Sequence, residues 1–290
     1  MDGLSLGDKM MRHAWRLAPQ RTLSELIGWC SGIRVPAAIR ARVLESFAAK
    51  YRIDVDEAER PLTSYESVDD FFTRRLRPGA RPLDPDPRAV VAPADGRLVA
   101  TGVIRDQGIE AKNIRFKTAA LLGDASTAAR FEGGTFQVTY LSPRDYHRVH
   151  APTGGRVTSW HHLPGELFPV NDGSVRREPD LFARNERFVS VFSGEPGVFA
   201  VVMVAAVGVG HITAAYDPEV RTHRGPAALG EVRSKSFSDP PTLAKGDEIG
   251  IFHLGSTAII LFEPGRVAFD PVVPGQPIRM GVRVGQLTSA

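Results

Sequence analysis

The hydrophobic pattern of the chain changes its period near residue 80, and this change limits the folds that the chain can adopt. Before that point apolar residues recur every three or four positions, as from Ile39 to Tyr51, which predicts amphipathic helices. Ser67 stands where a helix N-cap belongs, ahead of a further apolar run. Residues 78–93 hold five prolines and predict an extended connector.

Beyond the connector, short apolar or alternating runs are separated by Gly, Pro and Asp, a pattern typical of strands and turns. The predicted strands cover residues 97–103, 134–141, 188–192, 198–207, 248–252 and 257–262. Because no helical run alternates with them, the pattern favours antiparallel pairing. The sequence therefore predicts an α+β protein, with a helical region (1–77) ahead of a predominantly antiparallel β sandwich or barrel core (78–290).

Basic residues are concentrated at the amino end. Residues 1–52 hold nine Lys or Arg and four acidic residues, a net charge of +5, which leaves −2 for the remainder because the whole chain carries +3. A basic segment beside a nearly neutral body indicates attraction to an anionic surface, either lipid headgroups or nucleic acid. The helical runs here suit helices lying in a membrane interface, although the same apolar faces can equally pack on the protein's own core.

Composition and run lengths argue against several classes of protein. The longest apolar stretch, Val198 to Val207, has ten residues, half of the roughly 20 that a membrane-spanning helix needs. The first 20 residues contain no sustained apolar run, so no signal peptide is expected. A single cysteine, Cys30, rules out a disulfide framework, and the histidines lack zinc-ligand spacing, so no metal is expected. The β region has no basic stripe with interleaved aromatics, which argues against nucleic-acid binding.

The segment Leu254-Gly255-Ser256-Thr257 lies between two apolar runs. A Gly-Ser pair is most often a turn. It also permits one specific reaction, in which the serine hydroxyl attacks the preceding carbonyl, unshielded at glycine, and converts the peptide bond to an ester. Elimination followed by hydrolysis releases ammonia and leaves a pyruvoyl ketone at the head of a second chain of 35 residues.

Two histidines three positions apart, His147 and His150, lie in a polar stretch with interleaved arginines. On a strand they point to opposite faces, whereas in a turn or short helix they converge. They can serve as bases, metal ligands or phosphate-contacting cations. Asp95 precedes Gly96 in what is commonly a turn, but its carboxylate can also orient and charge a histidine. Each of these features alone is more often structural than catalytic.

Together these segments resemble the phosphatidylserine decarboxylases of the bacterial and mitochondrial type. The matching segments, in order, are Pro93-Ala94-Asp95-Gly96, Leu141-Ser142-Pro143-Arg144-Asp145-Tyr146-His147-Arg148-Val149-His150, Gly165-Glu166-Leu167-Phe168-Pro169-Val170-Asn171, Leu181-Phe182-Ala183-Arg184-Asn185-Glu186-Arg187, Leu254-Gly255-Ser256-Thr257 and Phe262-Glu263-Pro264-Gly265. The resemblance runs from roughly residue 40 to residue 270. Several separated motifs in one order are far more specific than any single motif.

The resemblance implies a self-cleavage relay formed by Ser256, His150 and Asp95. His150 takes the proton from the Ser256 hydroxyl, and Asp95 holds the imidazole in the required tautomer. The backbone breaks between Gly255 and Ser256, and the large chain (1–255) and small chain (256–290) remain associated. The relay serves self-cleavage alone, because Ser256 is consumed.

The resemblance also implies the reaction, decarboxylation of phosphatidylserine to phosphatidylethanolamine in phospholipid biosynthesis. The covalent pyruvoyl group made from Ser256 forms a Schiff base with the substrate amine and accepts the electrons released with carbon dioxide. His147 is implied as the donor that returns a proton to the α-carbon. No metal takes part.

The same resemblance implies a peripheral protein on the cytoplasmic face of the cell membrane. Its partners are then the substrate phosphatidylserine and an anionic membrane surface, to which each nearby cation contributes about 1 kcal/mol. Nucleic acid is not among the expected partners, and a homodimer stays open.

Three other interpretations remain. A pyruvoyl enzyme acting on a free amino acid needs no lipid-facing helices, and the basic amino end argues against it. A serine hydrolase with the same triad predicts an uncut chain with a reactive Ser256. A non-enzymatic membrane-binding β module predicts that Ser256→Ala changes neither chain length nor phenotype.

Overall fold

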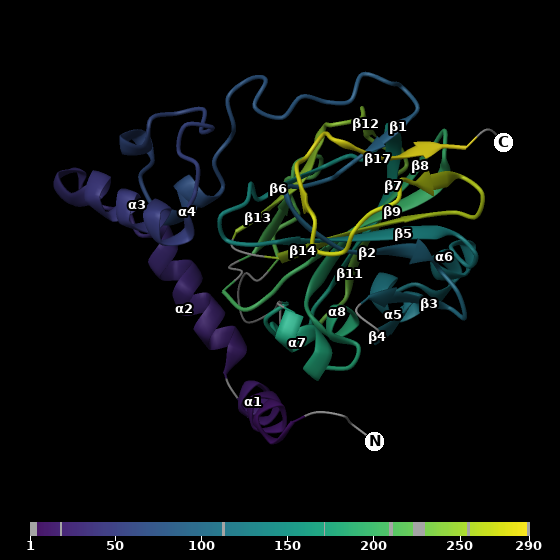
Figure 1. The fold of residues 1–290 in the computed structure, drawn as a ribbon, viewed down its shortest axis with the longest axis horizontal. Coiled ribbons are helices and arrows are strands. Elements are labelled where there is room, and N and C mark those ends of the chain that lie inside the picture. Colours follow the sequence, from purple (N-terminus) through teal and green to yellow (C-terminus); the bar gives the residue numbers. More distant parts are fainter. Residues whose placement is uncertain are drawn as a thin grey trace.

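The computed structural model describes residues 5–17, 19–111, 114–170, 172–208, 211–222, 230–253 and 256–288. The described residues ahead of the β core form helices that stand to one side of it (Figure 1). The helices are α1 (Leu6–Leu17), α2 (Gln20–Gly32), α3 (Ala37–Tyr51) and α4 (Val68–Phe72), with the 3-10 turn η1 (Leu62–Ser64) before α4. None of the described helices is both long and apolar enough to cross a membrane.

The start of α4 confirms the predicted cap. The Ser67 side chain accepts a hydrogen bond from the Asp70 amide, which satisfies one of the free donors at the helix start. Behind the cap, Phe71 packs with Leu44 of α3 in a small apolar cluster separate from the main core. The helices therefore have a core of their own, and α4 is fixed to it.

One large antiparallel sheet organises the β core. In spatial order it contains β11 (Arg233–Ser236), β7 (Gly155–Leu163), β8 (Arg187–Gly194), β9 (Gly197–Val204), β14 (Ser256–Phe262), β5 (Thr135–Leu141), β2 (Gly96–Val103) and β16 (Pro277–Ile278), with β12 (Thr242–Leu243) also paired to β7. β14 pairs along its whole length with β5 and from its second residue with β9, and all of its residues are buried. A strand held on both sides in this way cannot leave without breaking two ladders.

Smaller sheets and short helices complete the core. The smaller sheets are β1 (Ala89–Val91), β17 (Arg283–Leu287) and β15 (Val267–Phe269); β10 (Ile212–Ala214), β13 (Glu248–Phe252) and β6 (Arg148–His150); and β3 (Gly108–Ala111) with β4 (Ile114–Lys117). The short helices are α5 (Thr118–Leu122), α6 (Ala125–Arg130), α7 (Asp172–Arg177) and α8 (Leu181–Arg184). All named strand pairs are antiparallel, so the predicted α+β class with an antiparallel, sandwich-like core is confirmed.

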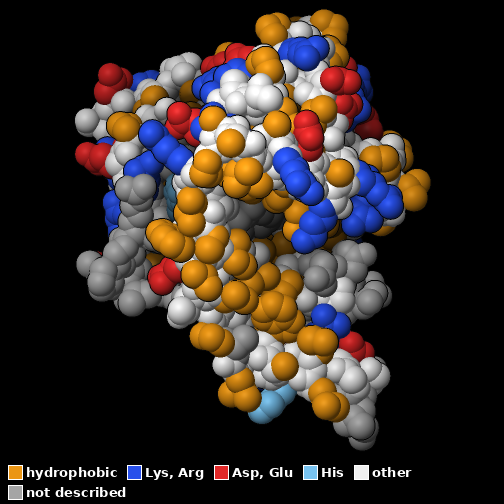
Figure 2. Space-filling model, turned by 90° about the vertical axis from the view of Figure 1, so that its left-hand side faces the viewer, with side chains coloured by type: hydrophobic (Ala, Val, Ile, Leu, Met, Phe, Trp, Pro, Cys, Tyr) orange, Lys and Arg blue, Asp and Glu red, His pale blue; other side chains and the backbone are white. Residues whose placement is uncertain are grey.

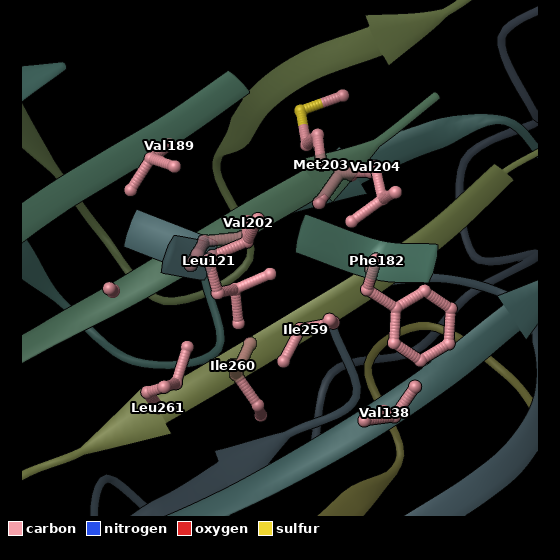
Figure 3. Close-up of a cluster of buried hydrophobic side chains, with 14 of the residues drawn as sticks. Leu121, Val138, Phe182, Val189, Val202, Met203, Val204, Ile259, Ile260 and Leu261 are labelled. Atoms are coloured by element: carbon pink, nitrogen blue, oxygen red, sulfur yellow. The ribbon is translucent and has the colours of Figure 1, made fainter. Parts of the chain in front are cut away.

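The apolar core lies around β14. Figure 3 shows side chains from α5, α8 and the neighbouring strands gathered about it, among them Leu121, Phe182 and Val202. Because both faces of β14 are covered, its sequence is a continuous apolar run rather than an alternating one.

Asn185, directly after α8, joins two backbone segments of the core. It is fully buried, its Oδ1 accepts from the Phe168 amide at 3.0 Å, and its Nδ2 donates to the carbonyls of Phe168 and Ala205 at 2.8 and 2.9 Å. These three side-chain hydrogen bonds all go to backbone groups of other segments.

We expect Asn185→Ala to lower the free energy of unfolding by about 3 kcal/mol, because it leaves buried backbone groups without partners. Urea unfolding monitored by circular dichroism measures the change. Ser193→Ala, which alters an exposed side chain on β8, serves as the control and should stay within about 0.5 kcal/mol of the unsubstituted protein. A loss below about 1 kcal/mol at Asn185 would contradict the assigned role.

Candidate active site

Ser256 is the first residue of β14 and is completely buried. It pairs with Leu141, the last residue of β5. In the described part of the chain its Oγ has no hydrogen-bond partner. A buried hydroxyl without a partner is costly. The expected cleavage partner, Gly255, lies outside the described residues.

His147 is fully buried, and its ring packs on Phe72 of α4 with 4.0 Å between ring centroids. Its Nδ1 lies 2.8 Å from the carbonyl oxygen of Asp145. Since a carbonyl only accepts, Nδ1 carries the proton and Nε2 holds a lone pair. Nε2 is buried with no partner among the described residues. Burial lowers the pKa of the imidazole to about 3, so the ring is a neutral base at physiological pH.

His150 lies on β6 and is nearly buried. Its Nδ1 donates to the Gly246 carbonyl at 2.8 Å, which leaves Nε2 to accept from the Tyr146 hydroxyl at 3.1 Å. Burial lowers the pKa of His150, whereas the charges of Glu248 and Asp95 act to raise it. Burial also raises the pKa of Tyr146 to about 12, so its hydroxyl keeps its proton.

Asp95 is buried immediately before β2, but its hydrogen bonds do not go to His150. Its carboxylate accepts from Nε of Arg81 at 2.8 and 3.0 Å and from the amide of Met280 at 2.8 Å. Arg81 also binds Glu57 through two nitrogens. Burial and these two carboxylates act in opposite directions on Arg81, and the carboxylates prevail and raise its pKa. Arg81 is therefore a fixed cation beside Asp95.

The register brings the four expected residues to one end of the large sheet. Asp95 directly precedes β2, Ser256 begins β14, and His147 follows the end of β5 by six residues. The amide of His150 donates to the Pro93 carbonyl at 2.7 Å, which ties β6 to the Asp95 segment. Among the described residues, however, no hydrogen bond directly joins any two of these four side chains.

Sequence reasoning missed Arg81 and the Tyr146 hydroxyl. Tyr146 lies inside one of the segments that carry the resemblance, so its place directly before His147 was a usable signal. Arg81 lies in the proline-rich connector, where no pattern separates a buried arginine side chain from a solvated one. His162 pairs with Glu186 at 3.0 Å inside the core.

An apolar cavity of about 290 Å³ adjoins these groups. Its walls include Phe72, which touches His147, and Leu141, which pairs with Ser256. The helical region supplies Ile27 of α2 and Phe47 of α3 to the same walls. Figure 2, a view of this side of the molecule, shows hydrophobic side chains gathered around a hollow. The cavity can receive an apolar ligand beside both buried groups.

Among the residues that the structure describes, no cluster of three or more His, Cys, Asp or Glu side chains is arranged to hold a metal ion. What the geometry provides is a buried hydroxyl, two neutral imidazoles and a fixed carboxylate at one end of a sheet. Such a set can support nucleophilic and acid–base chemistry in a dry pocket.

Comparison with known proteins assigns the family. A sequence profile of phosphatidylserine decarboxylase matches residues 68–286. The chain is 42% identical to a phosphatidylserine decarboxylase proenzyme of Anaeromyxobacter sp. (strain K), over 97% of this chain and 99% of that protein. Proteins of the same name from Myxococcus xanthus (strain DK1622) and Bordetella avium (strain 197N) are 41% and 44% identical, over 98% and 96% of this chain and 100% and 95% of theirs.

The profile and the relatives define a class, that of decarboxylases made as proenzymes. Within this class the chain belongs to the phosphatidylserine decarboxylase family. The resemblance noted in the sequence is confirmed, and the match reaches further toward the carboxyl end than the motifs alone indicated.

We expect His147 to stay neutral from pH 8 down to about pH 4, because protonation would place a charge in a site that excludes water. An NMR titration of the imidazole resonances measures this, and His147→Gln identifies the signal. The pKa of His147 is lower in the folded state than in the unfolded chain, so the unfolded chain takes up the proton first as the pH falls. The free energy of unfolding should therefore decrease as the pH drops below about 6.5. A titration midpoint above pH 5.5 would contradict the burial argument.

Proposed function

We propose that the protein converts phosphatidylserine to phosphatidylethanolamine, using a pyruvoyl group that it makes from Ser256 by breaking the Gly255–Ser256 bond. One observation carries the proposal: among the described residues the Ser256 hydroxyl is buried without a partner at the start of the central strand. Its strand partner Leu141 and the neighbour of the His147 ring, Phe72, line the same apolar cavity. The family and the proenzyme names of the relatives support it.

Self-cleavage needs a base for the Ser256 proton, and we assign this role to His150. Its Nε2 holds a lone pair because Nδ1 is committed to the Gly246 carbonyl. The Tyr146 hydroxyl must release Nε2 for the transfer to occur. Once His150 is protonated, the Asp95 carboxylate favours the charged ring, in keeping with its effect on the His150 pKa. Asp95 is thus proposed to act through its charge while Arg81 fixes its position.

The strand pairing supports the proposal that the large and small chains stay associated after cleavage. The small chain (256–290) begins with β14, which is paired with β5 and β9 of the large chain. It also contributes β17, which pairs with β1. Separation of the chains would expose these ladders and the core around them, so the cleaved protein should remain one folded unit.

In the lipid reaction the ketone supplies the carbonyl that condenses with the amine and accepts the electrons released with carbon dioxide. The protein's own contribution is a balanced proton transfer at His147. Its Nε2 lone pair can take the proton that the substrate ammonium must lose before it reacts. The same nitrogen can return that proton to the α-carbon after carbon dioxide has left. The dry surroundings of the ring prevent exchange with solvent.

The helical region is proposed to hold the protein on an anionic membrane at its cytoplasmic face. Trp29 is 68% exposed and Leu17 72%, although both are large and apolar. Further exposed apolar side chains on α1 to α3 are Met10, Met11, Leu23, Leu26, Ile27 and Ile39. Together with the +5 charge of residues 1–52, this surface suits an interfacial membrane contact. A homodimer remains compatible with these observations.

A pyruvoyl enzyme for free amino acids is less consistent with the site. A small polar substrate needs polar walls, whereas the cavity beside Ser256 is lined by aromatic, aliphatic and proline side chains from the helices and the core.

We expect the purified protein to contain two chains, the smaller starting with a blocked pyruvoyl group, because Ser256 is converted to the ketone. Intact-mass measurement tests this. Ser256→Ala should give one chain with the full 31.5 kDa mass and no decarboxylase activity. An active wild-type protein that remains a single chain would refute the mechanism.

The proposed division of roles predicts two kinds of defect. His150→Ala and Asp95→Ala should slow self-cleavage. His147→Ala should cleave more normally yet lower the decarboxylation rate by about 10²- to 10⁴-fold, the contribution of one positioned proton-transfer group. Mass spectrometry follows cleavage, and carbon dioxide release follows catalysis.

His161→Ala is the matched control, because this half-buried histidine lies on β7 and should affect neither step. Equal cleavage defects in His147→Ala, His150→Ala and Asp95→Ala would show that the two roles are not separate.

A further inference from the structure

Arg74, two residues beyond α4, is a buried cation that forms no ion pair with the described residues. It is 3% exposed, and its Nε and Nη1 have no hydrogen-bond partner among the described residues. Its remaining contact is a long one, 3.5 Å from Nη2 to the carbonyl oxygen of Arg144. The guanidinium also lies over the Phe71 ring, 5.3 Å from its centroid.

Such a group is costly unless an anion joins it. Burial lowers the pKa of Arg74, which reflects the cost of keeping its charge out of water. A guanidinium nevertheless keeps its proton at physiological pH, and its geometry matches phosphate and carboxylate oxygens. The charge must therefore be compensated by something other than loss of a proton, and a ligand oxyanion is the group best suited.

Arg74 lines a polar pocket of about 300 Å³. Its charged lining comprises five arginines and four carboxylates, namely Arg52, Arg74, Arg81, Arg144, Arg279, Asp54, Glu57, Asp95 and Asp145. Arg81 and Arg279 are paired with Glu57, and Arg81 also with Asp95. Arg144 lies 3.6 Å from Asp145. These pairs do not include Arg74, on which Asp95 and Glu57 act only through their charge and without a direct contact.

The strand register places this pocket close to Ser256 but not at it. Arg97, next to the lining residue Gly96, pairs with Tyr140, and the following residue of β5, Leu141, pairs with Ser256. Gly96, in the pocket wall, and Ser256 are thus two strands apart. With about 4.8 Å between neighbouring strands, the distance between them is on the order of 10 Å. The leaving carboxylate of the substrate is bonded to the same carbon as the reacting amine and cannot reach so far. The phosphate, four bonds from the amine, can extend toward the pocket.

We propose that Arg74 anchors a phosphate-binding site in this pocket, which takes the phosphate diester of the lipid headgroup. The assignment rests on the proposed function. Tyr146, whose hydroxyl bonds Nε2 of His150, also lines the pocket. Free inorganic phosphate has the same chemistry and is the alternative occupant.

The test compares Arg74→Gln with Arg75→Gln, its exposed neighbour, which does not line the pocket. Intact mass first establishes the cleaved fraction of each variant. Decarboxylation is then measured against phosphatidylserine in mixed detergent micelles. Arg74→Gln should raise KM by about 10- to 100-fold, the loss expected for a charge-assisted hydrogen bond, with kcat changed by less than about threefold. Arg75→Gln should leave both unchanged.

A second measurement identifies the occupant. Glycerophosphoserine should raise the melting temperature of the cleaved wild-type protein and not that of Arg74→Gln. A rise with inorganic phosphate alone would overturn the headgroup assignment. If Arg74→Gln is active and its KM equals that of the wild-type protein, the phosphate site is overturned while the decarboxylase function stands. If the wild-type protein itself is inactive, the proposed function is overturned.

Should Arg74→Gln fail to fold, Arg144→Gln gives the second variant, because the Arg144 side chain is half exposed at the same pocket. It should raise KM by about 3- to 10-fold with kcat unchanged, since a partly solvated cation contributes less. An unchanged KM there, together with no effect of glycerophosphoserine on the wild-type melting temperature, would likewise overturn the site.

Discussion

The pairing of β14 on both sides is the constraint on which the rest of the structure depends. Because β5 and β9 supply its hydrogen bonds, the strand lies in the middle of the core and its first residue, Ser256, is shielded from water. Bulk water would compete for the ester that the proposed self-cleavage requires, so a buried start is an advantage. The same pairing would retain the strand after the proposed cleavage. One structural feature would thus serve both the formation of the pyruvoyl group and the integrity of the cleaved protein.

Arginines connect the helical region to this core. Arg81 joins Glu57, in the segment after α3, to Asp95 ahead of β2, and Asp95 in turn accepts from the Met280 amide of the small chain. Arg148 on β6 donates to the Thr73 carbonyl at the end of α4 and to Glu248 on β13. Breaking one partner of a buried ion pair leaves an uncompensated charge, which typically costs about 3–5 kcal/mol. The position of α4 is therefore coupled to that of the expected catalytic groups.

Much of the β core was predicted from the sequence, because strands buried on one face show alternating apolar residues and strands buried on both faces show continuous apolar runs. The run 248–252 matches β13, and 257–262 begins one residue after the start of β14. The run 198–207 was predicted too long, since β9 ends at Val204 and the next amide leaves the ladder to bond the Glu186 carbonyl. The helices α5 to α8, of four to six residues, are too short for a helical period to be detected.

The expected site residues were identified from the order of several motifs along the chain. The local sequence pattern alone indicated only a turn or a structural histidine at each of them. Neither source predicted that Arg81 holds Asp95 or that Arg74 is buried, because both depend on tertiary contacts from a segment that resembles an ordinary basic linker. Charge in such a linker is easily assigned to solvent. Here both side chains lie inside the protein, where the cost at Arg81 is offset by carboxylates and the cost at Arg74 is proposed to be offset by a ligand.

The placement of α4 relates the shape of the site to an amphipathic substrate. Phe72 at its end lines the apolar cavity and touches His147, and Arg74 two residues later lines the polar pocket. Ile27 of α2 and Phe47 of α3 complete the apolar wall from the same exposed, basic region. The helical region is consequently a wall of the proposed site as well as the proposed membrane contact. In the proposed scheme, self-cleavage depends on groups of the core and needs neither pocket to be filled, whereas turnover of a lipid needs both.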